Sequence, residues 1–187
     1  MKTHKIKHIQ GSKILLEPFS HKFINDDYLA WMNDEDTTKF IQKAKKNTTL
    51  EDLNLFANKM IASEVDYFFA ILLKKNLQHV GNVRLGPVDF KLMKSNFGIM
   101  IGSKNFRGCG VGTEVLNLIK EFSFGYLKLK QIIFPVVQEH VPAMRLYKKA
   151  GFVLQKNTLK KTFNKNGQTW KLVEWEMRNP NIREIDE

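Results

Sequence analysis

The sequence predicts a single mixed α/β domain, with a mostly antiparallel central sheet, one parallel crossover and flanking helices. Three observations lead to this fold class. Apolar segments of strand length follow one another through the middle of the chain, with turn residues between them. A strand, a glycine turn and a helix then lead into a further strand, which is the pattern of one parallel crossover. No repeat, low-complexity run or linker divides the 187 residues, which fit one domain over 1–187.

The first elements are predicted to be one strand and two helices. Residues 13–19 are mostly apolar and end around Pro18, which stops the strand. A helix follows, because its apolar residues have helical spacing: Tyr28, Leu29, Trp31 and Met32. The segment Thr48-Thr49-Leu50-Glu51 resembles the start of a second helix, since a capping hydroxyl precedes a further apolar series: Leu53, Phe56, Ala57, Met60 and Ile61.

The rest of the chain alternates between strands and helices. Three strands are expected over 67–73, 78–86 and 95–102. After the glycine turn we expect a helix over 113–126, a strand over 131–137 and a helix over 141–149. A final hairpin over 158–164 and 169–177 closes near Asn166-Gly167, a favoured two-residue turn pair.

Composition indicates a cytoplasmic protein. With 43% hydrophobic and 26% charged residues, the chain has the balance of an ordinary globular domain. Its longest purely apolar stretch, 68–73, is too short to span a bilayer, and the N-terminal residues lack the apolar core of a secretion signal. The single cysteine excludes an internal disulfide and suits a reducing compartment.

The net charge of +11 does not by itself indicate a nucleic-acid-binding protein. The lysines are scattered as pairs and are not gathered into one helix or tail, and neither zinc-ligand spacing nor an aromatic RNA-binding signature accompanies them. We therefore expect no specific nucleic-acid partner and no metal site. A basic surface does help to attract anionic ligands.

The most informative segment is 106–113, Phe-Arg-Gly-Cys-Gly-Val-Gly-Thr. It lies between a predicted strand and a predicted helix, and its glycines leave backbone N–H groups uncovered. The first turn of a helix adds further unpaired N–H groups and a positive dipole end, and Arg107 adds a full charge. The segment therefore predicts a site for a phosphate or pyrophosphate.

Three other interpretations of these glycines compete with that prediction. A P-loop requires a lysine after the last glycine, and none follows Gly112. A dinucleotide-binding fold places a similar turn here, with Glu139 near the expected acidic position, but its glycine spacing is G-x-G-x-x-G and this chain has one crossover. A purely structural glycine turn is the third interpretation.

Two segments, taken in order, resemble one family. Residues 107–113 are similar to the R/Q-x-x-G-x-G/A pyrophosphate loop of GNAT-type acetyltransferases. Further along, residues 143–152, Ala-Met-Arg-Leu-Tyr-Lys-Lys-Ala-Gly-Phe, resemble the A-x-x-L-Y-x-x-x-G-F signature of the same family. Residues 28–34 and 81–86 resemble the branch that includes ribosomal-protein N-terminal acetyltransferases and amino-sugar acetyltransferases.

The resemblance implies acetyl-CoA as donor, with a binding core over 97–152 and an acceptor-side region over 13–64. The arginine position of the pyrophosphate loop is Arg107. The pantetheine arm would pair like an added strand with Met100 and Ile101. The pyrophosphate would lie on the backbone N–H groups of the loop residues Gly108, Cys109, Gly110, Val111, Gly112 and Thr113.

The resemblance also implies direct attack of a neutral amine on the thioester, with Tyr147 at the position of the frequent general acid. A phenol stays protonated at neutral pH and can give its proton to the departing thiolate. The alternative is that Tyr147 only packs in the core. His140 replaces an asparagine that contacts the pantetheine arm in relatives, so we expect it to contact CoA; the alternatives are that it relays a proton or only fills a loop position.

The general base is left open. Relatives often carry a glutamate where this chain has Asn96, which cannot act as a base. The remaining candidates are Glu114, Glu139, Asp89 and a chain of water molecules. Cys109 lies at a helix N-terminus, where thiolate character is favoured, but direct transfer argues against a nucleophilic role.

The expected activity is N-acetylation of a primary amine on a small molecule, and a nucleotide-linked amino sugar is the acceptor we favour from residues 28–34 and 81–86. The N-terminal amine of a protein, such as a ribosomal protein, is the first alternative. An inactive acyl-CoA-binding or interaction module is the second, because the glutamate equivalent is missing at Asn96. A homodimer is compatible with the sequence, which leaves the oligomeric state open.

Overall fold

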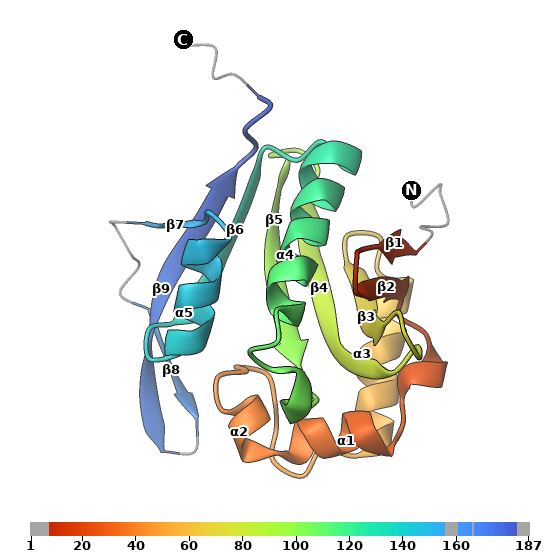
Figure 1. Cartoon of the computed structure of the whole chain (residues 1–187). Coiled ribbons are helices and arrows are strands. Elements are labelled where there is room, and N and C mark those ends of the chain that lie inside the picture. Colours follow the sequence, from red (N-terminus) through yellow and green to blue (C-terminus); the bar gives the residue numbers. More distant parts are fainter. Residues whose placement is uncertain (1–7, 156–160, 166, 183–187) are drawn as a thin grey trace.

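The structure is a computed structural model that describes residues 8–155, 161–165 and 167–182. Its strands form one sheet in the order β1-β2-β3-β4-β5-β6-β9-β7, and β8 pairs with β9 beside this path (Figure 1). The strands are β1 (Ile9–Gln10), β2 (Ile14–Pro18), β3 (Tyr67–Leu73), β4 (His79–Asp89), β5 (Lys94–Ile101), β6 (Gln131–Val137), β7 (Val153–Leu154), β8 (Thr162–Lys165) and β9 (Gln168–Arg178). The pair β5–β6 is parallel and the other strand pairs are antiparallel, as the sequence predicts.

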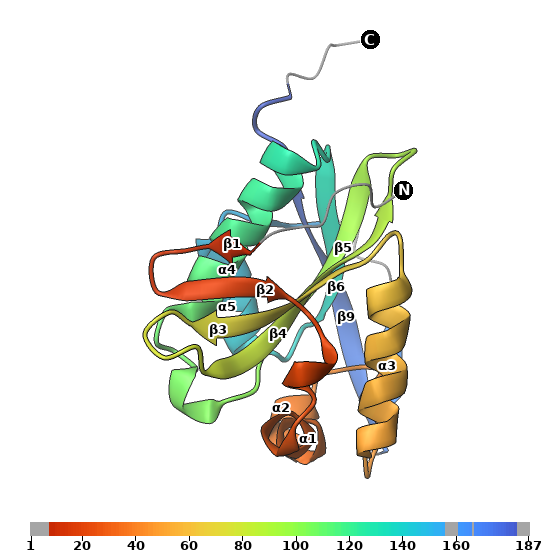
Figure 2. The ribbon, with the colours of Figure 1, turned by 90° about the vertical axis from the view of Figure 1, so that its right-hand side faces the viewer.

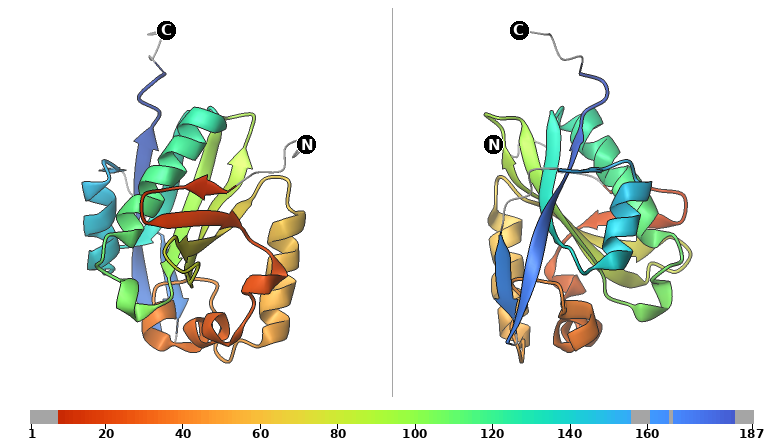
Figure 3. Two further views of the ribbon diagram at one scale, coloured as in Figure 1. Left: turned by 45° about the vertical axis from the view of Figure 1, so that its right-hand side comes forward. Right: turned by 90° about the vertical axis from the view of Figure 1, so that its left-hand side faces the viewer.

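Helices cover both faces of the sheet and one of its ends. They are α1 (Asp26–Asn33), α2 (Glu35–Thr38), α3 (Leu50–Ala62), α4 (Val111–Lys120) and α5 (Val141–Lys149), with short 3-10 turns at His21–Phe23 and Lys104–Phe106. Helices α4 and α5 lie on one face and α3 lies on the other (Figures 2 and 3). Helices α1 and α2 lie at the lower end of the sheet in Figure 1. None of the helices in the described residues combines the length and the apolar character needed to cross a bilayer.

Two apolar cores follow from this layering. The larger one packs the sheet against α4 and α5, and the side chains of Phe97, Phe134 and Trp175 lie in it. In the smaller one, α1, α3 and the segment before α1 pack against β3. It includes Phe19 and Tyr28. Because side chains alternate along a strand, the neighbours of Phe97 and Phe134 point to the face opposite α4 and α5. That face carries the cavity described below.

The helix starts show how local sequence sets the element bounds. Helix α3 begins with a capping box in which the Thr49 side chain and the Asp52 carboxylate each accept a bond from the other's backbone N–H. The capping residue is therefore Thr49, and Thr48 instead donates to the Lys45 carbonyl. Helix α2 was not predicted from the sequence because it is one turn long. Its N-cap is Asp34. The helix expected over 113–126 is α4 followed by a π-helical turn, Glu121–Tyr126.

The C-terminal hairpin is confirmed for β8 and β9, whose register pairs Thr162 with Lys171 and Lys165 with Gln168. Its first strand was expected from residue 158, and residues 158–160 and Asn166 lie outside the described residues. Strand β9 pairs with β6 along the whole of β6, from Gln131↔Arg178 to Val137↔Leu172. This register decides which β9 side chains reach the centre of the molecule.

The parallel strands β5 and β6 separate soon after they meet. They pair only through Lys94↔Gln131 and Ser95↔Ile132. Beyond these residues β5 stays on β4 as far as Ile101, and β6 stays on β9. The sheet is therefore split into two halves that diverge from Ser95 and Ile132, and Figure 1 shows the green β5 and the teal β6 moving apart.

Candidate active site

The glycine loop enters α4 with two residues in the left-handed region. Gly108 has φ +76° and Gly110, the N-cap of α4, has φ +86°. Only glycine adopts these angles without strain. A Cβ at either position would meet no protein atom within 4 Å, so the surface above the loop is open.

Six consecutive backbone N–H groups of this loop, those of residues 108–113, donate to no acceptor in the described part of the chain. The first helical bond there is from the Glu114 N–H to the Gly110 carbonyl, 3.1 Å. Unpaired N–H groups at the start of a helix bind anions through their hydrogen bonds and through the helix dipole. The loop thus has the open, donor-rich geometry that the sequence predicted.

The two family-like segments contact each other. A Cβ on Gly112 would lie 3.1 Å from Leu146 Cδ2, so the glycine lets α5 pack closely on the first turn of α4. Leu146 and Tyr147 come from the second segment, on α5. Two motifs far apart in sequence therefore build one face of the site.

The Arg107 guanidinium is hydrogen-bonded to protein groups beside the loop. Its Nε donates to the Ile101 carbonyl at 2.9 Å, and its Nη2 donates to Thr37 Oγ1 at 2.6 Å and to the Gly102 carbonyl at 3.2 Å. The guanidinium therefore joins the end of β5 to α2. A second link runs in parallel, because Lys104 Nζ lies 2.8 Å from the Asp34 carboxylate.

That ion pair joins the turn before the glycine loop to the N-cap of α2. Hydrogen bonds from the Lys104 and Thr37 side chains lower the pKa of Asp34 to about 2, and Asp34 in turn raises the pKa of Lys104. The predicted acceptor-side region is thus tied to the loop by charge-assisted bonds.

The remaining candidates are two residues at the end of β5 and the cysteine of the glycine loop. Met100 and Ile101 pair with Asn82 and Gly81 of β4 and face the gap left by β6. The exposed Cys109 has its Sγ 3.6 Å from the carbonyls of Asn105 and Arg107. In the described residues no base is bonded to this thiol.

Tyr147 is buried behind the point where β5 and β6 diverge. Its ring is 6% exposed and makes edge contacts with Phe134 (4.8 Å between centroids), Phe152 (6.1 Å) and Phe97 (6.3 Å). Burial raises its pKa well above the usual value, so the hydroxyl stays protonated. Within the described residues this hydroxyl has no hydrogen-bond partner, which leaves its proton free for a ligand.

His140 is the N-cap of α5. Its ring stacks on Phe40 at 4.5 Å, and Phe40 also contacts Trp170 at 5.0 Å. Burial and the nearby Arg107 charge lower its pKa, so the neutral form is favoured. Its Nδ1 is buried and has no hydrogen-bond partner among the described residues.

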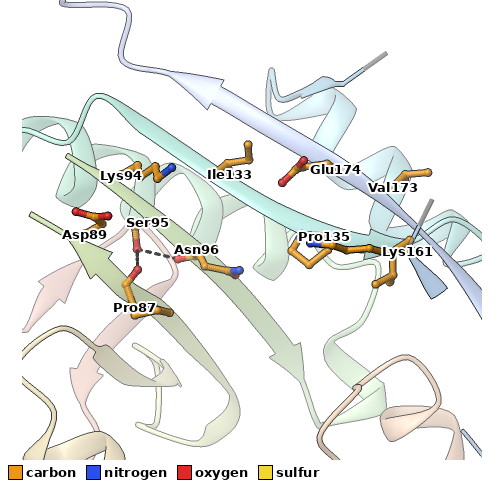
Figure 4. A pocket seen from close by; sticks show the side chains of 11 residues that line it. Pro87, Asp89, Lys94, Ser95, Asn96, Ile133, Pro135, Lys161, Val173 and Glu174 are labelled. Carbon is orange, nitrogen blue, oxygen red and sulfur yellow. Dashed lines mark hydrogen bonds between the residues drawn. The ribbon is translucent and has the colours of Figure 1, made fainter. Parts of the chain in front are cut away.

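A cavity of about 420 Å³ opens where the strands diverge, on the face opposite α4 and α5 (Figure 4). Asn96 comes from β5, Ile133 and Pro135 from β6, and Glu174 from β9. Pro87, Asp89, Lys94, Ser95, Lys161, Leu172 and Val173 complete the lining. The cavity therefore offers apolar walls with acidic, basic and amide groups, as a binding site for a small polar ligand does.

Of the base candidates expected from sequence, only Asp89 lines this cavity. Glu114 accepts a bond from the Lys13 N–H at 2.8 Å, and Glu139 is exposed in the turn after β6. Asn96 Oδ1 accepts from the Phe97 N–H at 2.6 Å. Glu174 was missed, although its alternation with the buried Val173 and Trp175 places a carboxylate on the opposite face of an interior strand.

Comparison with known proteins agrees with this geometry. The family model described as "Acetyltransferase (GNAT) domain" matches residues 13–153, most of the chain. The chain belongs to the GNAT acetyltransferase family. Membership of this family makes the protein an acetyl-CoA-dependent N-acetyltransferase.

Individual relatives are distant but cover nearly the whole domain. The chain is 24% identical over 180 residues to human alpha/beta-tubulin-N-acetyltransferase 9, covering 87% of this chain and 86% of the relative. It is 24% identical over 163 residues to an N-acetyltransferase 9-like protein of Caenorhabditis briggsae, covering 81% and 80%. Spermidine N-acetyltransferase from Vibrio cholerae, solved with CoA and spermine, has a TM-score of 0.80 at 20% identity, covering 90% of this chain and 97% of that one. This last likeness concerns the fold.

Proposed function

We propose that this GNAT acetyltransferase moves the acetyl group of acetyl-CoA to a primary amine held in the cavity between β5, β6 and β9. The observation that carries the proposal is the pairing of two features around one split in the sheet. Six unpaired N–H groups form an anion site at the end of β5, and a cavity with apolar and charged walls opens at the other end of the same split. A donor and an acceptor can therefore meet from opposite faces of the sheet.

In this proposal the donor runs along the unpaired edge of β5. Its pyrophosphate lies on the N–H groups of residues 108–113, and its pantetheine arm pairs with Met100 and Ile101. From Ile101 back to Asn96 the strand covers roughly 17 Å, at about 3.3 Å per residue. The thioester then lies near the point where β5 and β6 diverge, in front of Tyr147.

Tyr147 acts as the general acid. Its hydroxyl is protonated and has no partner in the described residues, so it can donate to the sulfur that leaves. His140 contacts the donor, and its lowered pKa favours the neutral ring, which keeps one nitrogen as a hydrogen-bond acceptor.

For the acceptor, we propose an amine that also carries negative charge. Lys94 and Lys161 line the cavity and form no ion pair in the described residues, and the chain carries a net charge of +11. These lysines attract the anionic part of an acceptor. A nucleotide-linked amino sugar has both groups, which supports the acceptor expected from sequence.

The N-terminal amine of a protein is the second candidate. The curated relatives that match almost the full domain include a human enzyme named for tubulin N-acetylation. An N-terminus followed by acidic residues supplies the same pairing of ammonium and anion. We keep the cytoplasmic location and a homodimer as predictions, to be checked by fractionation and by light scattering.

Two measurements test the proposal. A thermal-shift assay should give stabilisation with acetyl-CoA and none with NAD or ATP, and stabilisation by NAD alone would contradict it. Release of CoA thiol should then be followed with a UDP-linked amino sugar, a serine-initiated acidic peptide and spermidine under one set of conditions. Turnover of either anionic acceptor above spermidine supports the proposal. Tight acetyl-CoA binding with no turnover on any amine would indicate an inactive binding module.

A further inference from the structure

Glu174 brings a carboxylate to the split in the sheet from the strand beyond β6. It pairs in register with Pro135. Counting from the last paired residues of β5 and β6, Ser95 and Ile132, three further residues lead to Gly98 and Pro135. Glu174 therefore lies level with Gly98, on the far side of the opening.

On the β5 side of the opening, Gly98 carries no side chain at this level. Gly98 is exposed, and a Cβ built on it would meet no atom within 4 Å. Asn96, on the same face of β5, lines the cavity opposite the β6–β9 wall (Figure 4). Asn96 and Glu174 thus come from opposite walls of the cavity, and a ligand can lie between them.

Among the described acidic residues near the cavity, Glu174 is the one whose carboxylate is not paired with another protein group. It forms neither a hydrogen bond nor an ion pair in the described residues, although the side chain is only partly exposed. By contrast, Asp89 accepts the N–H groups of Lys91 (3.0 Å) and Leu92 (2.8 Å), and Glu176 accepts from Gln131 Nε2. A partly buried carboxylate without a partner costs stability, which a cationic ligand would recover.

We propose that Glu174 binds the ammonium group of the acceptor and is the general base of acetyl transfer, an inference that rests on the function proposed above. The side chain replaces, from across the opening, the acid that Asn96 cannot supply. Its charged neighbours in the cavity are Asp89, Lys94 and Lys161. The two lysines remain available for the anionic part of the same acceptor.

Acetyl transfer in this arrangement conserves atoms and charge. The Glu174 carboxylate takes a proton from the ammonium group, and the nitrogen lone pair forms the C–N bond to the thioester carbon. The C–S electron pair leaves with sulfur, which receives the Tyr147 hydroxyl proton, and Tyr147 regains a proton from the nitrogen through water. The products are the acetylated amine, CoA thiol and one proton, which Glu174 releases to solvent.

The kinetic test compares Glu174→Gln with Glu176→Gln, using the amine of the panel that the wild type turns over fastest. Glu176 lies on the same face of β9 but does not line the cavity, so it is a matched control. We expect Glu174→Gln to lower kcat/KM by roughly 100-fold or more, and Glu176→Gln by less than about 3-fold, with acetyl-CoA affinity unchanged in both. Glu174→Ala should recover part of its rate when formate is added. Wild-type kcat/KM in Glu174→Gln would overturn the inference and leave the proposed function standing.

If the wild type acetylates none of the amines in the acceptor panel, a binding measurement tests the role of Glu174 separately from the proposed function. The proposed function then fails, and Glu174 is tested with 2-aminoethyl phosphate, a primary amine that carries an anion. In protein labelled with ¹³C at the glutamate carboxyl carbons, addition of this probe to the CoA complex should shift the signal that Glu174→Gln removes. A signal that does not move would overturn the assignment of Glu174 as the ammonium site.

Discussion

Replacing Tyr147 by phenylalanine separates a catalytic hydroxyl from a packing ring. The ring contacts with Phe134, Phe152 and Phe97 are kept in Tyr147→Phe, and the hydroxyl has no hydrogen bond in the described residues to lose. A lost hydrogen bond costs about 1 kcal/mol, so its absence here predicts a stability change below about 0.5 kcal/mol. The melting temperature should shift by less than roughly 2 °C.

Turnover should respond very differently. Loss of a general acid lowers kcat by roughly 100-fold or more, equal to about 2.7 kcal/mol of activation free energy. The assay is CoA thiol release, with acetyl-CoA affinity measured by calorimetry and expected to stay within about 3-fold. Tyr126→Phe is the matched control, because it removes the same atom from an exposed ring on the turn after α4. Near-normal turnover together with a stability loss above about 1 kcal/mol would refute the acid role and indicate packing alone.

Three further changes test the donor loop and its links. Gly110→Ala should lower the free energy of unfolding by about 1–2 kcal/mol, because an alanine is strained at φ +86°, and urea unfolding measures this loss. It should also weaken acetyl-CoA binding, measured by calorimetry, by about 10-fold or more, since a strained loop no longer holds its N–H groups in place. Arg107→Ala removes a cation that lowers the pKa of His140, so the NMR titration of that ring should move to higher pH; an unchanged titration would show that burial alone sets it. The pKa of Asp34 is lowered on folding, so its contribution to stability is full above about pH 4 and is lost as the pH falls toward about 2. Wild type and Asp34→Asn should therefore differ in unfolding free energy at pH 5 and converge near pH 2, and a constant difference would contradict this.

The geometry of the glycine loop could be predicted from sequence because it depends on the backbone. Alternate glycines before a helix leave N–H groups uncovered whatever surrounds them, and the structure has Gly108 and Gly110 in the left-handed region as that requires. The contact between Gly112 and Leu146 explains why the two motifs occur together. Helix α2 was missed because a single turn carries too few residues for a periodic pattern.

The acceptor side could not be predicted in the same way, because it depends on long-range register. Glu174 reaches the cavity only because Pro135 pairs with it, and a shift of one residue would turn it to the other face. The direction of Arg107 depends on α2, whose Thr37 accepts from its guanidinium. The stacking of His140 on Phe40 likewise joins α5 to the loop after α2, which no local pattern indicates.

The most direct test of the account is mass spectrometry of the amine products after incubation of the wild-type protein with acetyl-CoA and the acceptor panel. We expect one acetyl group on an amine that also carries negative charge, together with an equal amount of free CoA thiol. Removing Glu174 or the Tyr147 hydroxyl should abolish most of this product while acetyl-CoA still binds. An acceptor panel that remains unmodified, with acetyl-CoA bound and intact, would contradict the account.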